Sequence, residues 1–222
     1  MPCFFCQVHY QSGMMQDLQR EMTNKGVIWL LIDFPYPTRW HGWPDLPKID
    51  ETPASARKIW EYQKMAVTDW IIDWNGSRWG TQVGMTYSMQ TMPEVFVIGK
   101  DGTLAYMGAI DNFQEVYNAN PEAIGYSHWA IDSFLAGYHQ EVRAIYGEQP
   151  PTPGPRPIPM PPDRRECAVF NFSTHRSRNY LREALNALLA GETVAVPETK
   201  PYGCGIAELI YGTPDHPFGP LN

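Results

Sequence analysis

Residues 3–32 read CFFCQVHYQSGMMQDLQREMTNKGVIWLLI, a stretch that joins a cysteine pair to a helix and a strand. Apolar side chains recur every four positions between Ser12 and Gly26, which predicts an amphipathic helix that ends at Gly26. These apolar positions are Met14, Leu18 and Met22. The run 27–33 is short, apolar and rich in β-branched and aromatic residues, so it predicts a strand buried on both faces.

The rest of the chain shows further helix and strand patterns. The predicted elements are a helix that begins at Pro53, a strand at 70–73, a hairpin of 93–98 and 103–110 about the turn 99–102, a long amphipathic helix at 121–147, a proline-rich linker at 149–162 and a helix that Ser177 caps and Gly191 ends. This order predicts an α/β fold, a mixed sheet flanked by helices. No strand pattern precedes the first helix, so we expect the first core strand to be missing and the N-terminus to be truncated.

The composition argues against two classes of partner. The 222 residues carry a formal net charge of −7, whereas nucleic-acid-binding proteins usually cluster Lys and Arg on one face, so no nucleic-acid partner is expected. No apolar run reaches the roughly 20 residues that span a bilayer, so a soluble protein without a membrane partner is expected. No secretory signal is visible, but because a truncation is expected, the sequence does not indicate the cellular compartment. It does not indicate the oligomeric state either.

Cys3 and Cys6 have the spacing of a redox pair at the start of a helix. One helical turn separates the thiols, which allows a disulfide between them, and the partial positive charge of a helix N-terminus stabilises the thiolate of Cys3. Cys6 then resolves a mixed disulfide by intramolecular attack. A zinc site needs a second ligand pair, but Cys167 and Cys204 lie far apart, and His9 is only a minor alternative ligand. No metal or other cofactor is expected.

Two later blocks of sequence are considered together with the opening stretch. They read TMPEVFVIGKDGTLAYMGAIDN at 91–112 and YLREALNALLAGETVAVPETKPYGCGI at 180–206. Together with 3–32 they resemble the redoxin or thioredoxin-like family. The resemblance implies a thioredoxin fold, a redox-active Cys3, and a cis-proline loop facing it. The substrate-binding residues of that loop are then Thr91, Met92 and Pro93, with the Met92 backbone free to pair with an extended substrate.

These features predict a thiol-disulfide oxidoreductase that exchanges disulfides with protein partners through Cys3 and Cys6. A peroxiredoxin-like thiol peroxidase is the alternative enzyme, although the Pro and Thr typical of such a site do not precede Cys3. The non-catalytic alternative is a binding module or an inactive fragment, in which residues 113–176 recruit a partner. The corresponding bland interpretation of Cys3 and Cys6 is a pair of inert buried residues. Cys204, between two glycines, is a candidate third redox thiol or a structural residue. Asp33, which ends the first strand, is a candidate proton relay.

The predicted domain organisation places one insertion inside the thioredoxin-like core. The parts are a core at 1–112, an insertion at 113–176 with the long helix and the proline-rich linker, the closing helix and tail of the core at 177–206, and a C-terminal extension at 207–222. The sequence of the insertion leaves its function open.

Overall fold

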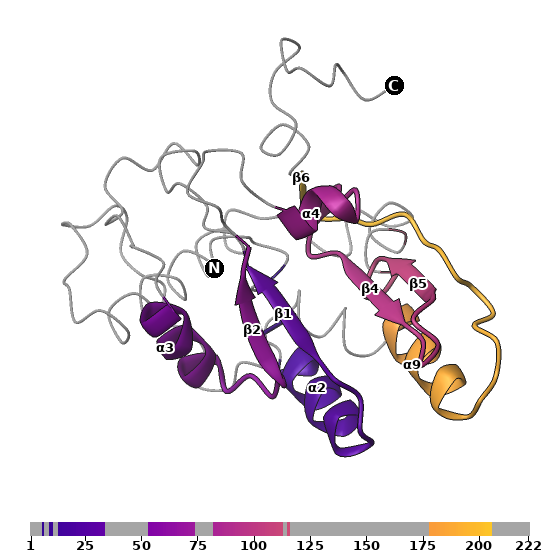
Figure 1. Ribbon diagram of the computed structural model, residues 1–222, viewed down its shortest axis with the longest axis horizontal. Helices are drawn as coiled ribbons and strands as arrows, with labels where there is room; N and C mark the ends of the chain where they lie inside the picture. The colour runs from indigo at the N-terminus through magenta and orange to yellow at the C-terminus, as the bar shows by residue number, and fades with distance from the viewer. Residues whose placement is uncertain are drawn as a thin grey trace, which may run out of the picture. The chain divides into compact units, whose positions relative to one another are not determined.

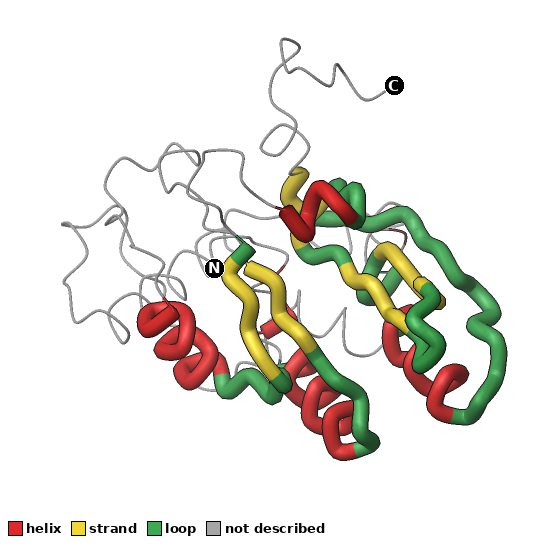
Figure 2. The backbone as a smooth tube through the Cα atoms, viewed as in Figure 1, coloured by secondary structure: helices red, strands yellow, loops and turns green. Residues whose placement is uncertain are grey.

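The structure is a computed structural model. It describes Cys6, His9–Tyr10, 13–33, 53–73, 82–112, Glu115 and 178–205. The chain divides into two units, Met1–Ile72 with Pro121–Thr174 and Asp73–Asn120 with His175–Asn222. Both contain helices and strands, so the fold is mixed α/β with small sheets, as Figure 1 and Figure 2 show. The predicted long helix at 121–147 and the linker at 149–162 lie outside the described residues.

In the first unit, helix α2 spans Met14–Asn24 and confirms the helix predicted between Ser12 and Gly26. Gly13 at its start and Gly26 after its end have positive φ angles of 80° and 88°, a conformation that glycine adopts without strain. The buried face consists of Met15, Gln16, Leu18, Gln19 and Met22. Two glutamines therefore share this face with the predicted apolar residues, because positions three and four apart on a helix are neighbours.

Strand β1, Leu30–Asp33, pairs in parallel with β2, Asp69–Ile72. A parallel pair needs a crossover connection, and helix α3, Pro53–Gln63, lies in that connection and begins at the predicted proline. The expectation that the first strand is buried on both faces was wrong, because Leu30 is 47% exposed. The described sheet of this unit has only these two strands, so it is too small to be covered on both sides along its length.

The second unit is built on the predicted hairpin. Strands β4, Val95–Ile98, and β5, Leu104–Gly108, pair antiparallel around the turn at 99–102. Asp101 supports this turn, since its Oδ1 accepts the backbone N–H of Thr103 at 3.0 Å. Three elements were not predicted: helix α4, Gln82–Thr86, and strands β3, Thr91–Met92, and β6, Cys204–Gly205, which pair antiparallel.

Helix α9, Tyr180–Leu189, packs on β4 and β5 and closes the core of this unit. Its N-cap is Asn179 rather than the predicted Ser177, because the Asn179 side-chain oxygen accepts the N–H of Arg182 at 2.8 Å. Gly191 follows the helix with a φ of 75°, as expected for a helix stop. The buried residues of the helix are Tyr180, Leu181, Ala184 and Leu185.

After α9 the chain runs back along β5 as a segment that we call the C-terminal strap, residues 197–205. Met107 donates its N–H to the carbonyl of Pro197 at 3.0 Å and accepts the N–H of Thr199 at 3.1 Å. A methyl group on Gly108 would lie 2.1 Å from the Thr199 carbonyl oxygen. The strap therefore lies against β5 at a distance that only a glycine at position 108 allows.

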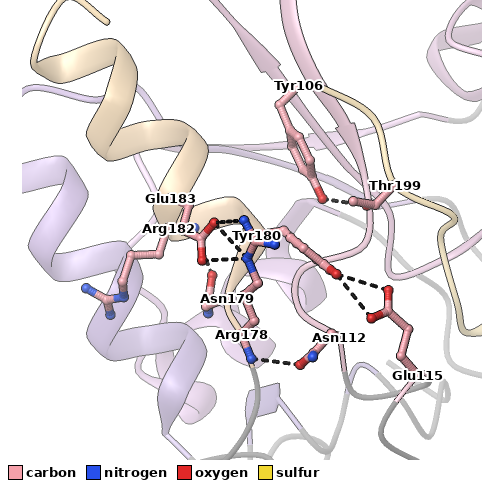
Figure 3. Close-up of polar contacts among 9 residues, drawn as sticks. All are labelled: Tyr106, Asn112, Glu115, Arg178, Asn179, Tyr180, Arg182, Glu183 and Thr199. Atoms are coloured by element: carbon pink, nitrogen blue, oxygen red, sulfur yellow. Dashed lines mark hydrogen bonds and ion pairs between the residues drawn. The ribbon is translucent and has the colours of Figure 1, made fainter. Parts of the chain in front are cut away.

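Two hydrogen bonds of the Thr199 hydroxyl join the strap to the hairpin, and Figure 3 shows the one with Tyr106. The Tyr106 hydroxyl donates its single proton to the Ala109 carbonyl at 2.5 Å, because a carbonyl can only accept. The Thr199 hydroxyl, 2.7 Å away, must then donate to the Tyr106 oxygen, while its own oxygen accepts the Ala109 N–H at 2.9 Å. Burial raises the pKa of Tyr106 to about 12, so this phenol keeps its proton at neutral pH.

Thr199→Val is expected to lower the free energy of unfolding by about 2–3 kcal/mol, because it leaves a buried N–H of Ala109 and the Tyr106 oxygen without partners. For a chain of this length that corresponds to a fall in Tm of about 4–12 °C. The control is Thr193→Val, the same change at an exposed position of the same loop. Urea unfolding of both variants checks the expectation, and equal losses at the two positions would contradict it.

Candidate functional site

Cys6 is the member of the predicted redox pair that lies within the described residues, whereas Cys3 lies outside them. Cys6 is a helical residue, carries a free thiol and is only 7% exposed. A buried second thiol suits a resolving cysteine, because it meets a sulfur one helical turn away and is shielded from competing thiols in solution. The same burial also fits the alternative of an inert hydrophobic residue.

Two further chemistry-bearing side chains follow Cys6 at helical spacing. His9 and Tyr10 are also helical, and spacings of three and four residues place side chains on one face of a helix. Both are buried, with exposed fractions of 3% for His9 and 6% for Tyr10. The structure thus combines the Cys6 thiol with an imidazole and a phenol on one short segment. Tyr10 was missed from the sequence, although its i, i+4 spacing from Cys6 could have indicated it.

The Tyr10 hydroxyl is held in place by Gln19, a fully buried residue of α2. Gln19 Nε2 donates to the Tyr10 hydroxyl oxygen at 3.0 Å, and Gln19 Oε1 accepts the N–H of Ala66 at 3.1 Å. Because the amide donates to this oxygen, the phenol keeps its own proton available for another acceptor. Gln19 also fixes the position of Tyr10 relative to the segment that leads into β2.

Gln16 makes a second connection between the same segments. Its Nε2 donates to the backbone carbonyl of Tyr10 at 2.8 Å and to that of Gln63, the last residue of α3, at 2.9 Å. Gln16 and Gln63 are each 6% exposed, so both protons of this amide are used in the interior. The two buried glutamines of α2 therefore fasten the backbone and the side chain of Tyr10.

The environment of Tyr10 connects it electrostatically with Cys6 and Asp33. Burial strongly raises the pKa of the Tyr10 phenol, and negative charge on Cys6 and Asp33 raises it further, while the hydrogen bond from Gln19 lowers it. The phenol is therefore a protonated hydrogen-bond donor at physiological pH. Asp33, the candidate proton relay, ends β1, and its charge is one of those that raise the pKa of Tyr10. Its proposed role as a relay stays a prediction.

The Thr91–Met92–Pro93 loop lies in the second unit, and its Met92–Pro93 peptide bond is cis, which confirms the prediction for this bond. Cys6 and Pro93 belong to different units, so the expectation that the loop faces the cysteines stays a prediction. The loop was expected to leave its backbone open to a substrate strand, but β3, which contains Thr91 and Met92, is already paired. Thr91 is paired with Gly205 and Met92 with Cys204, both from the chain's own strap.

Glu94 shapes the loop on its other side, a role that the sequence did not indicate. Its Oε2 accepts the N–H of Gln90 at 2.7 Å and that of Thr91 at 3.3 Å, which closes the turn around Pro93. Burial raises the pKa of Glu94, while the two backbone hydrogen bonds lower it. The Thr91 N–H is thereby directed to Glu94. Met92, the next residue of the loop, is the one paired with Cys204.

A separate polar cluster fastens the start of α9, as Figure 3 shows. Arg178 forms an ion pair with Glu183 at 2.6 Å, and the Tyr180 hydroxyl donates to the Glu115 carboxylate at 3.0 Å. Hydrogen bonding from Arg178 lowers the pKa of Glu183, and burial raises that of Tyr180. Because the ion pair is solvent-exposed, it contributes little to stability. We interpret this cluster as structural.

Two absences complete the description of the site. No group of three or more metal-ligating side chains occurs within the described ranges. In the same part of the chain no helix is both long and apolar enough to cross a membrane. The side chain of Cys204, the candidate third thiol, lies outside the described residues, although its backbone forms β6. Comparisons with protein-family models, with curated proteins and with solved structures found no match.

Proposed function

We propose that this chain is a thiol-disulfide oxidoreductase of thioredoxin-like fold that exchanges disulfides with protein partners through Cys3 and Cys6. The Cys3 thiolate attacks a partner disulfide, forms a mixed disulfide and releases one partner thiolate, which takes up a proton. Cys6 then loses its proton, attacks the Cys3 sulfur and releases the second partner thiol. The partner disulfide is thereby reduced by two electrons, and the Cys3–Cys6 pair is oxidised to a disulfide. An external dithiol then reduces the pair again.

The observation that carries the proposal is the position of Cys6. It is a buried, free thiol on a helical residue, three positions after Cys3, and so fits the resolving partner of a helix-start pair. Its burial also explains the division of roles, because the first cysteine of such a pair is the one that meets the partner. This supports an intramolecular second step rather than a metal site.

Tyr10 adds chemical support to the same position. A thiol that attacks must lose a proton, and a sulfur that leaves must have its negative charge stabilised. The Tyr10 phenol stays protonated and is oriented by Gln19, so it is a preorganised donor for negative charge at the buried thiol. The Asp33 carboxylate, whose charge also raises the pKa of Tyr10, is the candidate acceptor for the Cys6 proton.

The test is reduction of insulin disulfides by dithiothreitol in the presence of the full chain, run beside consumption of hydrogen peroxide. The proposal expects catalysed insulin reduction, with peroxide consumption no faster than that of an ordinary thiol. Cys167→Ser, which removes a cysteine outside the motif, should retain the insulin activity. Rapid, saturable peroxide consumption without insulin reduction would instead identify the thiol peroxidase, and inactivity in both assays would leave the binding module.

A further inference from the structure

The C-terminal strap is firmly anchored as far as Tyr202. Thr199 is hydrogen-bonded to the hairpin, and Tyr202, 7% exposed, makes a hydrogen bond through its hydroxyl with the carboxylate of Asp111. Asp111 is itself 1% exposed and follows directly after Ile110 at the end of the hairpin. Residues 197–202 are therefore fastened to the hairpin through Thr199 and Tyr202.

After Tyr202 the strap is attached in a different way, through backbone pairing of β6 with β3. Residues 204–205 form a strand of only two residues, paired antiparallel with β3 so that Cys204 lies opposite Met92 and Gly205 opposite Thr91. A two-residue pair contributes few backbone hydrogen bonds, and weakly attached pairs of this kind open locally without unfolding the rest of a domain. The anchors at Thr199 and Tyr202 hold residues 197–202, so β6 can leave β3 and return without moving that part of the strap.

Gly203 is the residue that lets β6 reach β3. Its φ of 150° is one that side-chain-bearing residues rarely adopt, and a methyl group on it would lie 2.0 Å from the Met92 carbonyl oxygen. The next nearest atoms are also backbone, the Met92 carbonyl carbon at 2.6 Å and the Pro93 nitrogen at 3.1 Å. None of these atoms can rotate away as a side chain does, so any substitution here must separate β6 from β3.

We propose that residues 203–205 act as a displaceable internal competitor for the edge of β3, where an extended segment of a protein partner adds as an antiparallel strand. This inference rests on the proposed function. Extended peptides commonly bind to an open strand edge through main-chain hydrogen bonds. Here Cys204 and Gly205 stand opposite Met92 and Thr91, the positions that an antiparallel partner segment takes once β6 has left. A protein partner must therefore compete with residues 203–205, which lowers the apparent affinity of every partner by the fraction of time that the edge is open.

Gly203→Ala tests this competition in the full chain. By releasing β6 it should lower the KM for insulin by up to about tenfold, the change expected when an edge that is open about a tenth of the time becomes fully open. The matched control is Gly191→Ala, whose φ is also positive, at 75°, but whose methyl group meets no atom within 4 Å. Gly191→Ala should leave KM unchanged. A second variant that ends at Tyr202 removes residues 203–222, β6 included, without placing any new side chain at position 203, and its KM should match that of Gly203→Ala.

A small aromatic disulfide, 5,5′-dithiobis(2-nitrobenzoic acid), separates the two proposals. It needs no strand edge, so the rate at which Cys3 and Cys6 react with it should be equal in wild type and all three variants. The shortened chain lacks Cys204, so only the reaction of these two thiols is compared. If wild type reacts with neither this disulfide nor insulin, the proposed function is overturned. If it reacts with both, but the KM for insulin is unchanged or raised in Gly203→Ala and in the shortened chain, the internal competitor is overturned while the proposed function stands.

Amide hydrogen exchange gives a readout that is independent of activity. In wild type the amides of the β3–β6 pair should exchange faster than those of α9, because the pair opens locally. Gly203→Ala should accelerate exchange at Met92 and leave α9 unchanged. Protection at Met92 equal to that of α9 would contradict the displaceable tail.

Discussion

Cys3→Ser is expected to abolish disulfide exchange, by roughly a thousandfold or more, whereas Cys6→Ser is expected to accumulate a mixed disulfide with its partner. The difference arises because the helix N-terminus stabilises only the first thiolate, so Cys3 attacks with or without Cys6. Without Cys6 the mixed disulfide has no intramolecular resolving thiol. Non-reducing gels of each variant, incubated with an oxidised protein and alkylated, measure the trapped species.

The control for these gels is Cys167→Ser, which should behave as wild type. A double variant, Cys3→Ser with Cys6→Ser, should trap nothing, which shows that trapping requires Cys3. If Cys3→Ser traps the partner and Cys6→Ser does not, the roles of the two thiols are the reverse of those proposed. If both single variants retain turnover, neither cysteine is the nucleophile.

Asp73→Asn is expected to destabilise the chain by about 3–5 kcal/mol, the largest effect on stability that we predict. Asp73, 6% exposed, caps helix α4: its Oδ1 accepts the N–H of Gln82 at 2.9 Å, and its Oδ2 accepts those of Val83 and Gly84 at 2.8 and 3.0 Å. An asparagine has one acceptor oxygen instead of two, so its NH₂ group must point at a buried N–H donor. The expected fall in Tm is about 6 °C or more.

The matched control for Asp73 is Asp69→Asn, at the exposed start of β2. Asp69 accepts only the adjacent N–H of Trp70, at 2.8 Å, which an asparagine oxygen also accepts, so its effect should stay within about 0.5 kcal/mol. Thermal unfolding followed by circular dichroism compares the two. A loss at position 73 no larger than that at 69 would show that the three backbone hydrogen bonds do not stabilise α4.

Local sequence patterns predicted the elements whose formation depends on neighbours in the chain. Helix α2 follows from its apolar repeat, the start of α3 from Pro53, and the hairpin from two β-rich runs around the turn at 99–102. The end of α9 follows from Gly191. In each case the determining interactions span only a few residues, so they are visible in sequence order.

The misses arise where the folded backbone, rather than a local pattern of residues, determined the outcome. Helix α4 has five residues and no clear apolar repeat, and it is capped by Asp73, nine residues before its first residue. The cap of α9 was assigned two residues too early, since both Ser177 and Asn179 suit that role and only the folded backbone selects between them. Leu30 is exposed because the number of strands beside β1, rather than the apolar pattern, decides its burial.

For the candidate site, the sequence by itself identified the cysteine pair and the Met92–Pro93 bond, because both are signalled by spacing and by short motifs. Only the tertiary structure placed Gln19 against the Tyr10 hydroxyl and joined the phenol electrostatically to Cys6 and Asp33. Only the tertiary structure also paired Met92 with Cys204, 112 residues later in the chain. Hydrogen bonds between such distant segments depend on how the whole chain packs, and no local pattern of residues records that packing.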